Sequence, residues 1–397
     1  MIEVSEAQER IYAAAPAMPT EWVPLGNALG RVLACDVEAR RDQPPRAVSA
    51  MDGYAVRSVD ASGTMRVVGE VAAGSAVDIG LGSGEAVRIF TGGVLPKGAD
   101  AVLIQENARR EGDMLSATGP VHPGLFVRPQ GLDFAAGYRG LRAGRVLDPR
   151  ALGLAAVMGH GHVGVRIRPR VGVLATGDEL RLPGETPEAH QITSSNSTAL
   201  CAMLRCWGAE PVDLGIARDD RNALADALAH ARNVDMLVTT GGASVGEHDL
   251  IREVMTGVGI ELNFWKIRMR PGKPLIFGRL AERPFLGLPG NPVSTIVCGI
   301  MFLRGAVYSS LGLYAGLPWR DAAIAHDLEA NDTRRDFVRG FRLDDGRVDV
   351  AARQDSSMLA VMSGADVLLE RPPFDPARKA GETMRVLDLA EVLHVMV

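Results

Sequence analysis

Four loops in the middle of the chain combine glycine with acidic or polar side chains. Each follows a short apolar run, and they comprise residues 176–179 (TGDE), 218–220 (RDD), 240–246 (TGGASVG) and 287–292 (GLPGNP). Glycine lets backbone N–H groups approach an anion closely, and a helix beginning near Asp249 would point its positive end at a phosphate. The loops therefore favour a nucleotide phosphate or another oxyanion as ligand, although a Gly-Gly pair is also typical of an ordinary tight turn.

Carboxylates in the same loops would repel an anion unless a cation lies between them. They belong to Asp178, Glu179, Asp219, Asp220 and Asp249. Ligation by oxygen alone favours Mg²⁺ over zinc. For Asp219 or Asp220 the alternative is an N-cap of a helix that begins at Arg221.

Basic side chains gather in one further stretch. Only four of the 43 basic residues are lysines, and Lys266 and Lys273 both lie within residues 265–274 (WKIRMRPGKP). A compact ammonium group suits contacts to phosphate, whereas the alternative is a solvated basic edge.

Two segments nearer the N-terminus have a less specific chemistry. Residues 49–56 (SAMDGYAV) place an Asp-Gly pair between apolar flanks, which predicts a hairpin turn. Residues 89–93 (IFTGG) place the hydroxyl of Thr91 and two glycines at the end of a predicted strand. This segment could form a turn or contact an anion.

Alternating strand and helix patterns predict how the four loops are positioned. Apolar runs at 171–175, 211–216, 235–239 and 285–288 alternate with helical patterns at 197–207, 221–231, 249–256 and 292–311. This alternation predicts a parallel, doubly wound sheet, in which ligands bind beyond the carboxyl ends of the strands. The four loops should then meet at one edge.

The regions on either side of this alternating pattern are predicted to form mainly short β-strands. Short β-prone stretches with glycine-rich turns fill residues 40–131, and short strands with a hairpin turn at 344–346 follow Asp321. Helices are predicted from Ser5, as the cap, to about Ala15, and from Pro149 to Met158.

Length and composition limit the class of protein. A chain of 397 residues suggests two to four domains, and a net charge of −5 argues against a nucleic-acid or anionic membrane surface. The apolar run 293–303 ends at Arg304, short of the ~20 residues of a membrane span. Four cysteines without a CxxC pair indicate neither a zinc site nor a disulfide framework. We expect a soluble cytoplasmic protein.

Seven ordered segments make the chain resemble the molybdopterin molybdenumtransferase family, which includes the MoeA proteins and the gephyrin E domain. They span nearly the whole chain and comprise residues 49–56, 89–102, 176–180 (TGDEL), 215–220, 241–249, 270–274 and 287–294 (GLPGNPVS).

The resemblance implies a multidomain α/β plus β fold in an elongated, L-shaped homodimer. A Rossmann-like, pterin adenylyltransferase-like parallel-sheet domain would be joined by a β-rich insertion domain, an elongated N-terminal linker domain and a C-terminal β domain. The expected boundaries are 1–39 with 136–168 for the discontinuous N-terminal dimerisation domain, 40–135 for the β-rich domain carrying MDGYA, 169–317 for the α/β molybdopterin-binding domain and 318–397 for the C-terminal β domain.

The resemblance also implies a reaction. Such enzymes use Mg²⁺ to insert molybdate into adenylylated molybdopterin, which releases AMP and completes molybdenum cofactor biosynthesis. The implied partners are a second subunit that shares the site, a molybdopterin adenylyltransferase and maturation proteins of molybdoenzymes, with no nucleic acid and no membrane.

Carried over position by position, the resemblance implies three sets of site residues. The catalytic set is Asp52, Thr91, Glu179, Asp219, Asp249, Lys266, Arg270 and Lys273, with Asp52 and Thr91 coming from the partner subunit. The cofactor-binding set is Gly241, Gly242, Ser244, Gly246, Pro289, Gly290, Asn291 and Pro292. The metal set is Glu179, Asp219 and Asp249, and weaker matches are Asp133, Arg339 and Ser356.

Two departures and two alternatives accompany this assignment. Ser194 stands where the family commonly has an acid or amide before Ser/Thr-Asn, and Arg270 stands where some members have lysine. The alternative functions are a molybdopterin adenylyltransferase that uses ATP and a non-catalytic, gephyrin-like scaffold. The additional MDGYA segment disfavours the first, and the intact acids and lysines disfavour the second.

Overall fold

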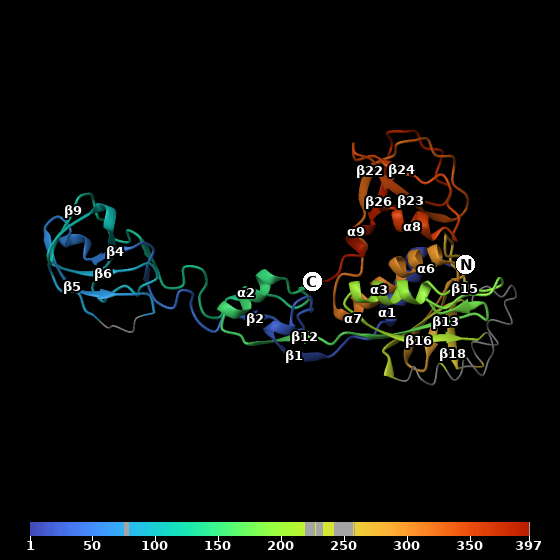
Figure 1. Cartoon of the computed structure of the whole chain (residues 1–397), viewed down its shortest axis with the longest axis horizontal. Helices are drawn as coiled ribbons and strands as arrows, with labels where there is room; N and C mark the ends of the chain where they lie inside the picture. The colour runs from blue at the N-terminus through green and yellow to red at the C-terminus, as the bar shows by residue number, and fades with distance from the viewer. Residues whose placement is uncertain (75–78, 219–226, 228–232, 242–256, 258, 397) are drawn as a thin grey trace.

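The chain folds into an elongated molecule. A computed structural model describes residues 1–74, 79–218, 227, 233–241, 257 and 259–396, and every structural statement below concerns these residues. A β-rich part lies at one end, a slender middle part follows, and the α/β and C-terminal β parts lie together at the other end (Figure 1).

The β-rich part is built on a six-stranded sheet in the order β7-β4-β6-β5-β9-β8. Buried apolar side chains cover both of its faces. Its strands are β4 (Gly53–Val56), β5 (Thr64–Val71), β6 (Glu85–Ile89), β7 (Ala101–Ile104), β8 (Ala108–Glu111) and β9 (Met114–Ala117), with short 3₁₀ turns at Ser58–Asp60 and Gln105–Asn107.

The predicted hairpin at Asp52-Gly53 is wrong. β3 (Val48–Ser49) pairs with β10 (Val127–Arg128), while β4 pairs with β6 and β7, so the Asp-Gly pair connects two different sheets. Glycine is required at position 53 by close packing, because a Cβ there would overlap the carbonyl oxygen of Leu103.

The middle part has a core of its own between α2 (Pro149–Val157) and two short strand pairs. These pairs are β1 (Thr20–Pro24) with β12 (His162–Arg166) and β2 (Val37–Glu38) with β11 (Arg139–Leu141), and a 3₁₀ turn spans Leu25–Asn27. The helix begins at Pro149 as predicted, and Asp148 caps it, since its carboxylate accepts the Ala151 N–H at 2.7 Å.

Helix α1 (Val4–Ala14) packs against the α/β part, but its predicted cap is wrong. Glu3 occupies the N-cap position without a side-chain hydrogen bond, and Ser5 lies inside the first turn. Val4, Ala7 and Ile11 are buried, so burial of one apolar face stabilises the helix.

The α/β part contains a six-stranded sheet that is only partly parallel. Its order is β16-β13-β17-β21-β20-β18; the first four strands are parallel, and β20 pairs antiparallel with both of its neighbours, β21 and β18. The strands are β13 (Arg170–Thr176), β16 (Glu210–Ala217), β17 (Met236–Thr240), β18 (Ile260–Phe264), β20 (Ile276–Leu280) and β21 (Arg283–Leu288). The four predicted strands are therefore parallel as expected, and the sheet continues into an antiparallel edge, β20 and β18, that was not predicted.

Helices cover one face of this sheet in Figure 1. They are α3 (Asn196–Cys206), α6 (Pro292–Cys298), a π-helical turn (Gly299–Leu303) and α7 (Arg304–Leu311). The helices predicted at 221–231 and 249–256 lie almost entirely outside the described residues, so the doubly wound arrangement stays a prediction. A small parallel pair, β14 (Leu180–Arg181) with β15 (Ile192–Thr193), lies beside β13 and α3.

The helical segment Pro292–Leu311 is long and apolar enough to cross a membrane, but 83% of it is buried inside the protein. The apolar run ends at Arg304, but the helical segment continues through this residue to Leu311, as the helical pattern at 292–311 predicts. Arg304 is buried, its guanidinium lies 4.0 Å from the centroid of the Tyr308 ring, and Nη1 donates to the carbonyl of Gly316. The segment is thus explained as a core helix.

The C-terminal part is a second β structure packed on the same core as the α/β helices. Its sheet has the order β19-β23-β25-β26-β22, and β24 pairs with β23 across the predicted hairpin turn at 344–346. The elements are β19 (Met269–Arg270), β22 (Arg320–Ala323), β23 (Arg335–Arg342), β24 (Val348–Val350), β25 (Val367–Arg371), β26 (Thr383–Asp388), α8 (Leu359–Gly364) and α9 (Leu389–Val392).

Replacing Phe302 tests the shared core. Its side chain is fully buried, so Phe302→Ala is expected to lower the free energy of unfolding by about 3–5 kcal/mol through loss of apolar contact and an unfilled cavity. Phe374 is 71% exposed, so Phe374→Ala should change the free energy of unfolding by less than about 0.5 kcal/mol. Urea unfolding followed by fluorescence measures both, and equal effects would contradict the assigned core.

Candidate functional site

Three strand ends of the α/β sheet meet at one edge, as the loop pattern predicts. The N–H of Gly241, after β17, donates to the carbonyl of Leu288 at the end of β21 at 3.4 Å. A Cβ at position 241 would overlap the carbonyl oxygen of Thr176 at the end of β13, and one at Gly290 would lie 3.5 Å from the Gly241 Cα. The lack of a Cβ at Gly241 thus lets the loop after β17 reach the end of β13, and Gly290 of the third loop packs beside it at ordinary contact distance.

Asn196, the first residue of α3, ties these loops together. Its Nδ2 donates to Thr240 Oγ1 at 2.8 Å and to the carbonyl of Gly290 at 2.7 Å. Thr295 Oγ1 donates to the carbonyl of Pro289 at 2.6 Å. Sequence reasoning missed Asn196 as a site residue, although an asparagine at the start of a helix is the kind of signal that could have found it.

Glu179 lies over the end of β13. A Cβ at Gly177 would be only 2.7 Å from Glu179 Oε2, so the carboxylate folds back over this glycine. Glu179 is exposed and forms no ion pair with another described residue. A carboxylate in this position is available to a cation at the sheet edge.

Three buried hydroxyl groups in this region have no hydrogen-bond partner among the described residues. They are Oγ1 of Thr176, at the end of β13, and Oγ of Ser194 and Ser197, on either side of the start of α3. Their residues are 9%, 3% and 7% exposed. An unpartnered buried hydroxyl costs about 1–3 kcal/mol, so a polar ligand that reached these groups would recover that cost. Ser194, the departure from the family pattern, belongs to this set.

The three basic side chains predicted for the site in residues 265–274 have different environments. Lys266 is half-buried, with Nζ 3.5 Å from the centroid of the Trp265 ring. Lys273 is exposed and has no ion-pair partner in the described parts of the chain. Arg270 binds Asp336 and Asp332 of the C-terminal part, the latter at 3.2 Å. In this structure the charge of Arg270 is therefore already countered, whereas that of Lys273 is free.

The C-terminal part also reaches the 287–292 loop. Asn291 Nδ2 donates to Ser356 Oγ at 2.8 Å, and the N–H of Val293 donates to the Ser356 carbonyl at 3.1 Å. Arg339 is 2% exposed, and its guanidinium binds Gln354 and the carbonyl of Asp355, which fixes the chain just before Ser356. Asn291 caps α6, and Pro292 is the first residue of that helix.

Asp52 and Thr91 lie together, but far from these loops. Asp52 Oδ1 accepts both the N–H and the Oγ1–H of Thr91 at 2.8 Å, and these bonds, with a smaller effect of the Arg88 charge, lower the pKa of Asp52. Both residues belong to the β-rich part, at the opposite end of the chain from β13 and β17 (Figure 1). Asp133 is exposed, and its N–H donates to the Gln43 carbonyl.

Several predicted site residues lie outside the described residues, namely Asp219, Asp249, Gly242, Ser244 and Gly246. Within the described parts no group of three His, Cys, Asp or Glu side chains is placed to hold a metal ion. Since two members of the metal set are not described, that set stays a prediction.

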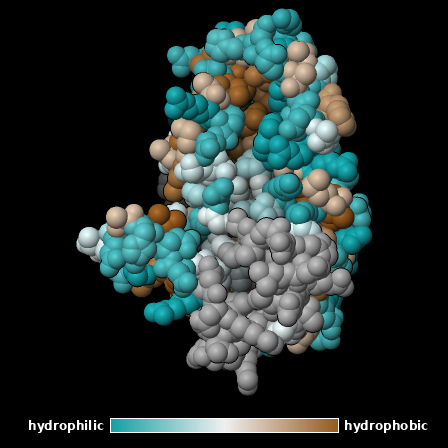
Figure 2. Space-filling model, turned by 90° about the vertical axis from the view of Figure 1, so that its right-hand side faces the viewer, coloured by the Kyte–Doolittle hydropathy of each residue, from teal (hydrophilic) through white to brown (hydrophobic). Residues whose placement is uncertain are grey.

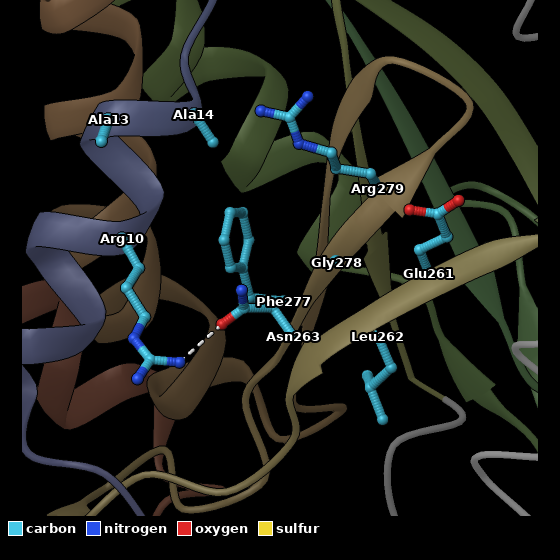
Figure 3. Close-up of a pocket in the computed structure, with 9 residues that line it drawn as sticks. All are labelled: Arg10, Ala13, Ala14, Glu261, Leu262, Asn263, Phe277, Gly278 and Arg279. Carbon is cyan, nitrogen blue, oxygen red and sulfur yellow. Dashed lines mark hydrogen bonds between the residues drawn. The ribbon is translucent and has the colours of Figure 1, made fainter.

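A separate hollow of about 360 Å³ lies between α1 and strands β18 and β20. Figure 3 shows Arg10 and Arg279 on two sides of Phe277, with Glu261 on β18. None of the predicted site residues lines it. Seen from the α/β end, the described surface is largely hydrophilic, with hydrophobic patches between (Figure 2).

Comparison with known proteins covers almost the entire chain. The family models of the MoeA N-terminal region (domain I and II), a probable molybdopterin binding domain and the MoeA C-terminal region (domain IV) match residues 2–159, 172–307 and 321–389. The molybdopterin molybdenumtransferase of Nostoc sp. is 33% identical over 389 residues, covering 93% of this chain and 89% of the relative. That of Haemophilus influenzae is 33% identical over 399 residues, covering 97% and 98%. The crystal structure of a molybdopterin biosynthesis MoeA protein from Pyrococcus horikoshii superposes with a TM-score of 0.88 at 29% identity, covering 98% and 99%.

Gly241→Ala is expected to disrupt the meeting point of the loops. The residue has φ 97°, which costs an L-amino acid about 1–2 kcal/mol, and its Cβ would in addition overlap the Thr176 carbonyl oxygen. The thermal unfolding midpoint should fall. Gly290→Ala is the matched control for stability, since its Cβ would find ordinary contact at 3.5 Å. Equal midpoints for both variants would contradict the close approach.

Thr91→Val is expected to raise the pKa of Asp52 but to leave it below the ordinary value. The variant removes the hydroxyl donor and keeps the backbone N–H, which has the larger effect. Because the folded-state pKa is lowered, the contact stabilises the fold above the ordinary aspartate pKa and this contribution is lost as pH falls through the lowered value. NMR titration of the Asp52 carboxyl measures the change, with Asp148 as an unaffected reference; an unchanged Asp52 pKa would rule out the hydroxyl as donor.

Proposed function

The chain belongs to the MoeA family of molybdopterin molybdenumtransferases, and from this we propose that it inserts molybdate into adenylylated molybdopterin and releases AMP. It is a transferase of molybdenum cofactor biosynthesis. The observation that carries the proposal is the meeting of Thr176, Gly241 and Gly290 at one sheet edge, with Glu179 above it and unpartnered hydroxyls beside it.

The sheet edge is suited to a ligand with phosphate and polar ring groups. Gly241 and Gly290 leave space for close backbone contact, and the hydroxyls of Thr176, Ser194 and Ser197 supply donors or acceptors that the protein itself does not use. We assign this edge to the pterin and phosphate portion of the substrate, with Pro289, Asn291 and Pro292 holding the shape of the third loop. Gly242, Ser244 and Gly246 complete this assignment from the family pattern.

Mg²⁺ is the proposed cofactor, held by Glu179 together with Asp219 and Asp249. The donor chemistry fits, because all three side chains are carboxylates and Glu179 has no competing ion pair among the described residues. When bound, the ion would counter the negative charge of the phosphate oxygens during cleavage of the adenylate.

Molybdate, the second oxyanion, requires positive charge of its own. Lys273 supplies it as an exposed and unpaired ammonium group, and Lys266 lies seven residues away on the same segment. Arg270 contributes to the field of this region, although its guanidinium binds Asp332 and Asp336. The Ser356 contact to Asn291 brings the C-terminal part next to the same loop.

A second copy of the chain is the proposed source of Asp52 and Thr91. Within one chain these residues lie at the far end of the molecule from the sheet edge (Figure 1). An elongated homodimer that places the β-rich part of one subunit against the α/β part of the other would complete the site. We expect it to act in the cytoplasm, between a molybdopterin adenylyltransferase and the maturation of molybdoenzymes.

The direct test incubates the purified protein with adenylylated molybdopterin, Mg²⁺ and molybdate. We expect AMP release and a product that activates an apo-molybdoenzyme. Glu179→Gln should lose AMP release, while Glu188→Gln, an exposed carboxylate in the following loop, should retain it. Formation of the adenylate from ATP without AMP release would instead identify an adenylyltransferase, and binding of the substrate without turnover would favour a scaffold.

Mixed dimers test the shared site. Asp52→Asn and Glu179→Gln homodimers should both be inactive, because each carries one defect in every site. Random association of the two variants makes half of the dimers mixed, each with one intact site of two, so AMP release should return to about a quarter of the wild-type rate. Mixed dimers that remain inactive would place Asp52 and Glu179 in the same site of one subunit or in unrelated roles.

A further inference from the structure

Arg88 in the β-rich part is a cation with a fixed position that forms no ion pair with a carboxylate among the described residues, although its charge acts on nearby Asp52. It lies on β6 directly opposite Tyr54 of β4, and Phe90 follows two residues later. The guanidinium carbon is 5.0 Å from the centroid of the Tyr54 ring and 5.1 Å from that of Phe90. Two aromatic rings therefore hold the cation in place without removing its charge.

Two hydrogen bonds fix the guanidinium to the surroundings of Asp52. Nη1 donates to the carbonyl of Gly53 at 3.3 Å, and Nη2 donates to Gln105 Oε1 at 2.9 Å. Gly53 directly follows Asp52, and the N–H of Gln105 donates to the Asp52 carbonyl at 3.2 Å. Both acceptors of Arg88 are neutral, so its position depends on the Asp52 turn, and its charge is only partly offset by the nearby Asp52 carboxylate.

Arg88 has more N–H donors than the described parts of the protein use. A guanidinium carries five N–H groups, and in the described parts of the chain only two of those of Arg88 find acceptors. Thr91 is in the opposite situation, because its N–H and its hydroxyl both donate to Asp52. Of these neighbours, Arg88 is thus the one with donors left for an incoming anion.

We propose that Arg88 binds a tetrahedral oxyanion of the substrate, a phosphate or molybdate, beside Asp52 and Thr91. The planar fork of an arginine fits two oxygens of such an anion, and a charge-assisted hydrogen bond of this kind is stronger than a neutral one. The inference rests on the proposed function, because it assigns to the β-rich part of one subunit a contact to the substrate held by the other.

The experiment compares full-length wild type, Arg88→Gln and Arg88→Lys by calorimetric titration with AMP and, separately, with molybdate, both in the presence of Mg²⁺. Arg88→Gln should weaken binding of at least one probe roughly 10- to 100-fold. Arg88→Lys should recover part of the loss, because it keeps the charge without the fork. A loss confined to AMP identifies a phosphate as the anion, and a loss confined to molybdate identifies molybdate.

The matched control is Arg109→Gln in the same part of the chain. Arg109 is 74% exposed and pairs with Glu111 at 2.9 Å, so its replacement should leave both affinities unchanged. Unfolding midpoints are measured alongside, because a purely structural role for Arg88 would lower the midpoint without changing anion affinity. If Arg88→Gln does not fold, Arg88→Lys decides: weaker binding at an unchanged midpoint supports the proposal, and unchanged binding overturns it.

Two results distinguish a failure of this inference from a failure of the proposed function. If the wild type releases AMP while Arg88→Gln binds both probes as tightly as wild type, only the role of Arg88 is wrong. If the wild type binds a probe but releases no AMP, the proposed reaction is wrong and the comparison of Arg88 variants still decides whether this residue binds an anion. A wild type that binds neither probe overturns the inference.

Discussion

The contact between the backbone at Gly241 and the Thr176 carbonyl is the constraint on which the α/β site depends. Neighbouring parallel strands bring their ends to one edge, but loops with ordinary side chains would keep each other apart. Here a residue without a Cβ allows β17 to turn directly against the end of β13, and Asn196 joins that turn to Gly290. The edge that we propose as the ligand site is therefore made mainly of backbone, with side chains such as Glu179 placed around it.

The electrostatics of the molecule follow from which charges are already paired. Arg270 is committed to two carboxylates of the C-terminal part, and burial raises the pKa of its partner Asp336 while the guanidinium opposes that rise. Lys273, three residues later, is left unpaired among the described residues. One segment thus provides both a structural connection between two parts of the chain and a charge that is available to a ligand.

Local signals in the sequence predicted local structure well. The start of α2 at Pro149, the strand predicted at 171–175 and the turn at 344–346 each depend on residues close in the chain. The strands of the antiparallel edge, β18 and β20, were not predicted, and a short apolar pattern does not distinguish parallel from antiparallel strands in any case. The Asp52-Gly53 pair misled for a related reason: its partners, Thr91 and Leu103, are distant in sequence. Roles of individual site residues came from the family resemblance, and Asn196, Arg88 and the partners of Arg270 required the structure.

The slender middle part has a consequence for how such a protein changes over evolutionary time. The β-rich part has its own buried clusters, and the chain enters and leaves it only once, on either side of residues 48–128. Such a module can be exchanged as a whole, or diverge at its own pace, without disturbing the packing of the rest. In the proposed homodimer, selection would act most strongly on the small rim around Asp52, where the module of one subunit would have to match the sheet edge of the other.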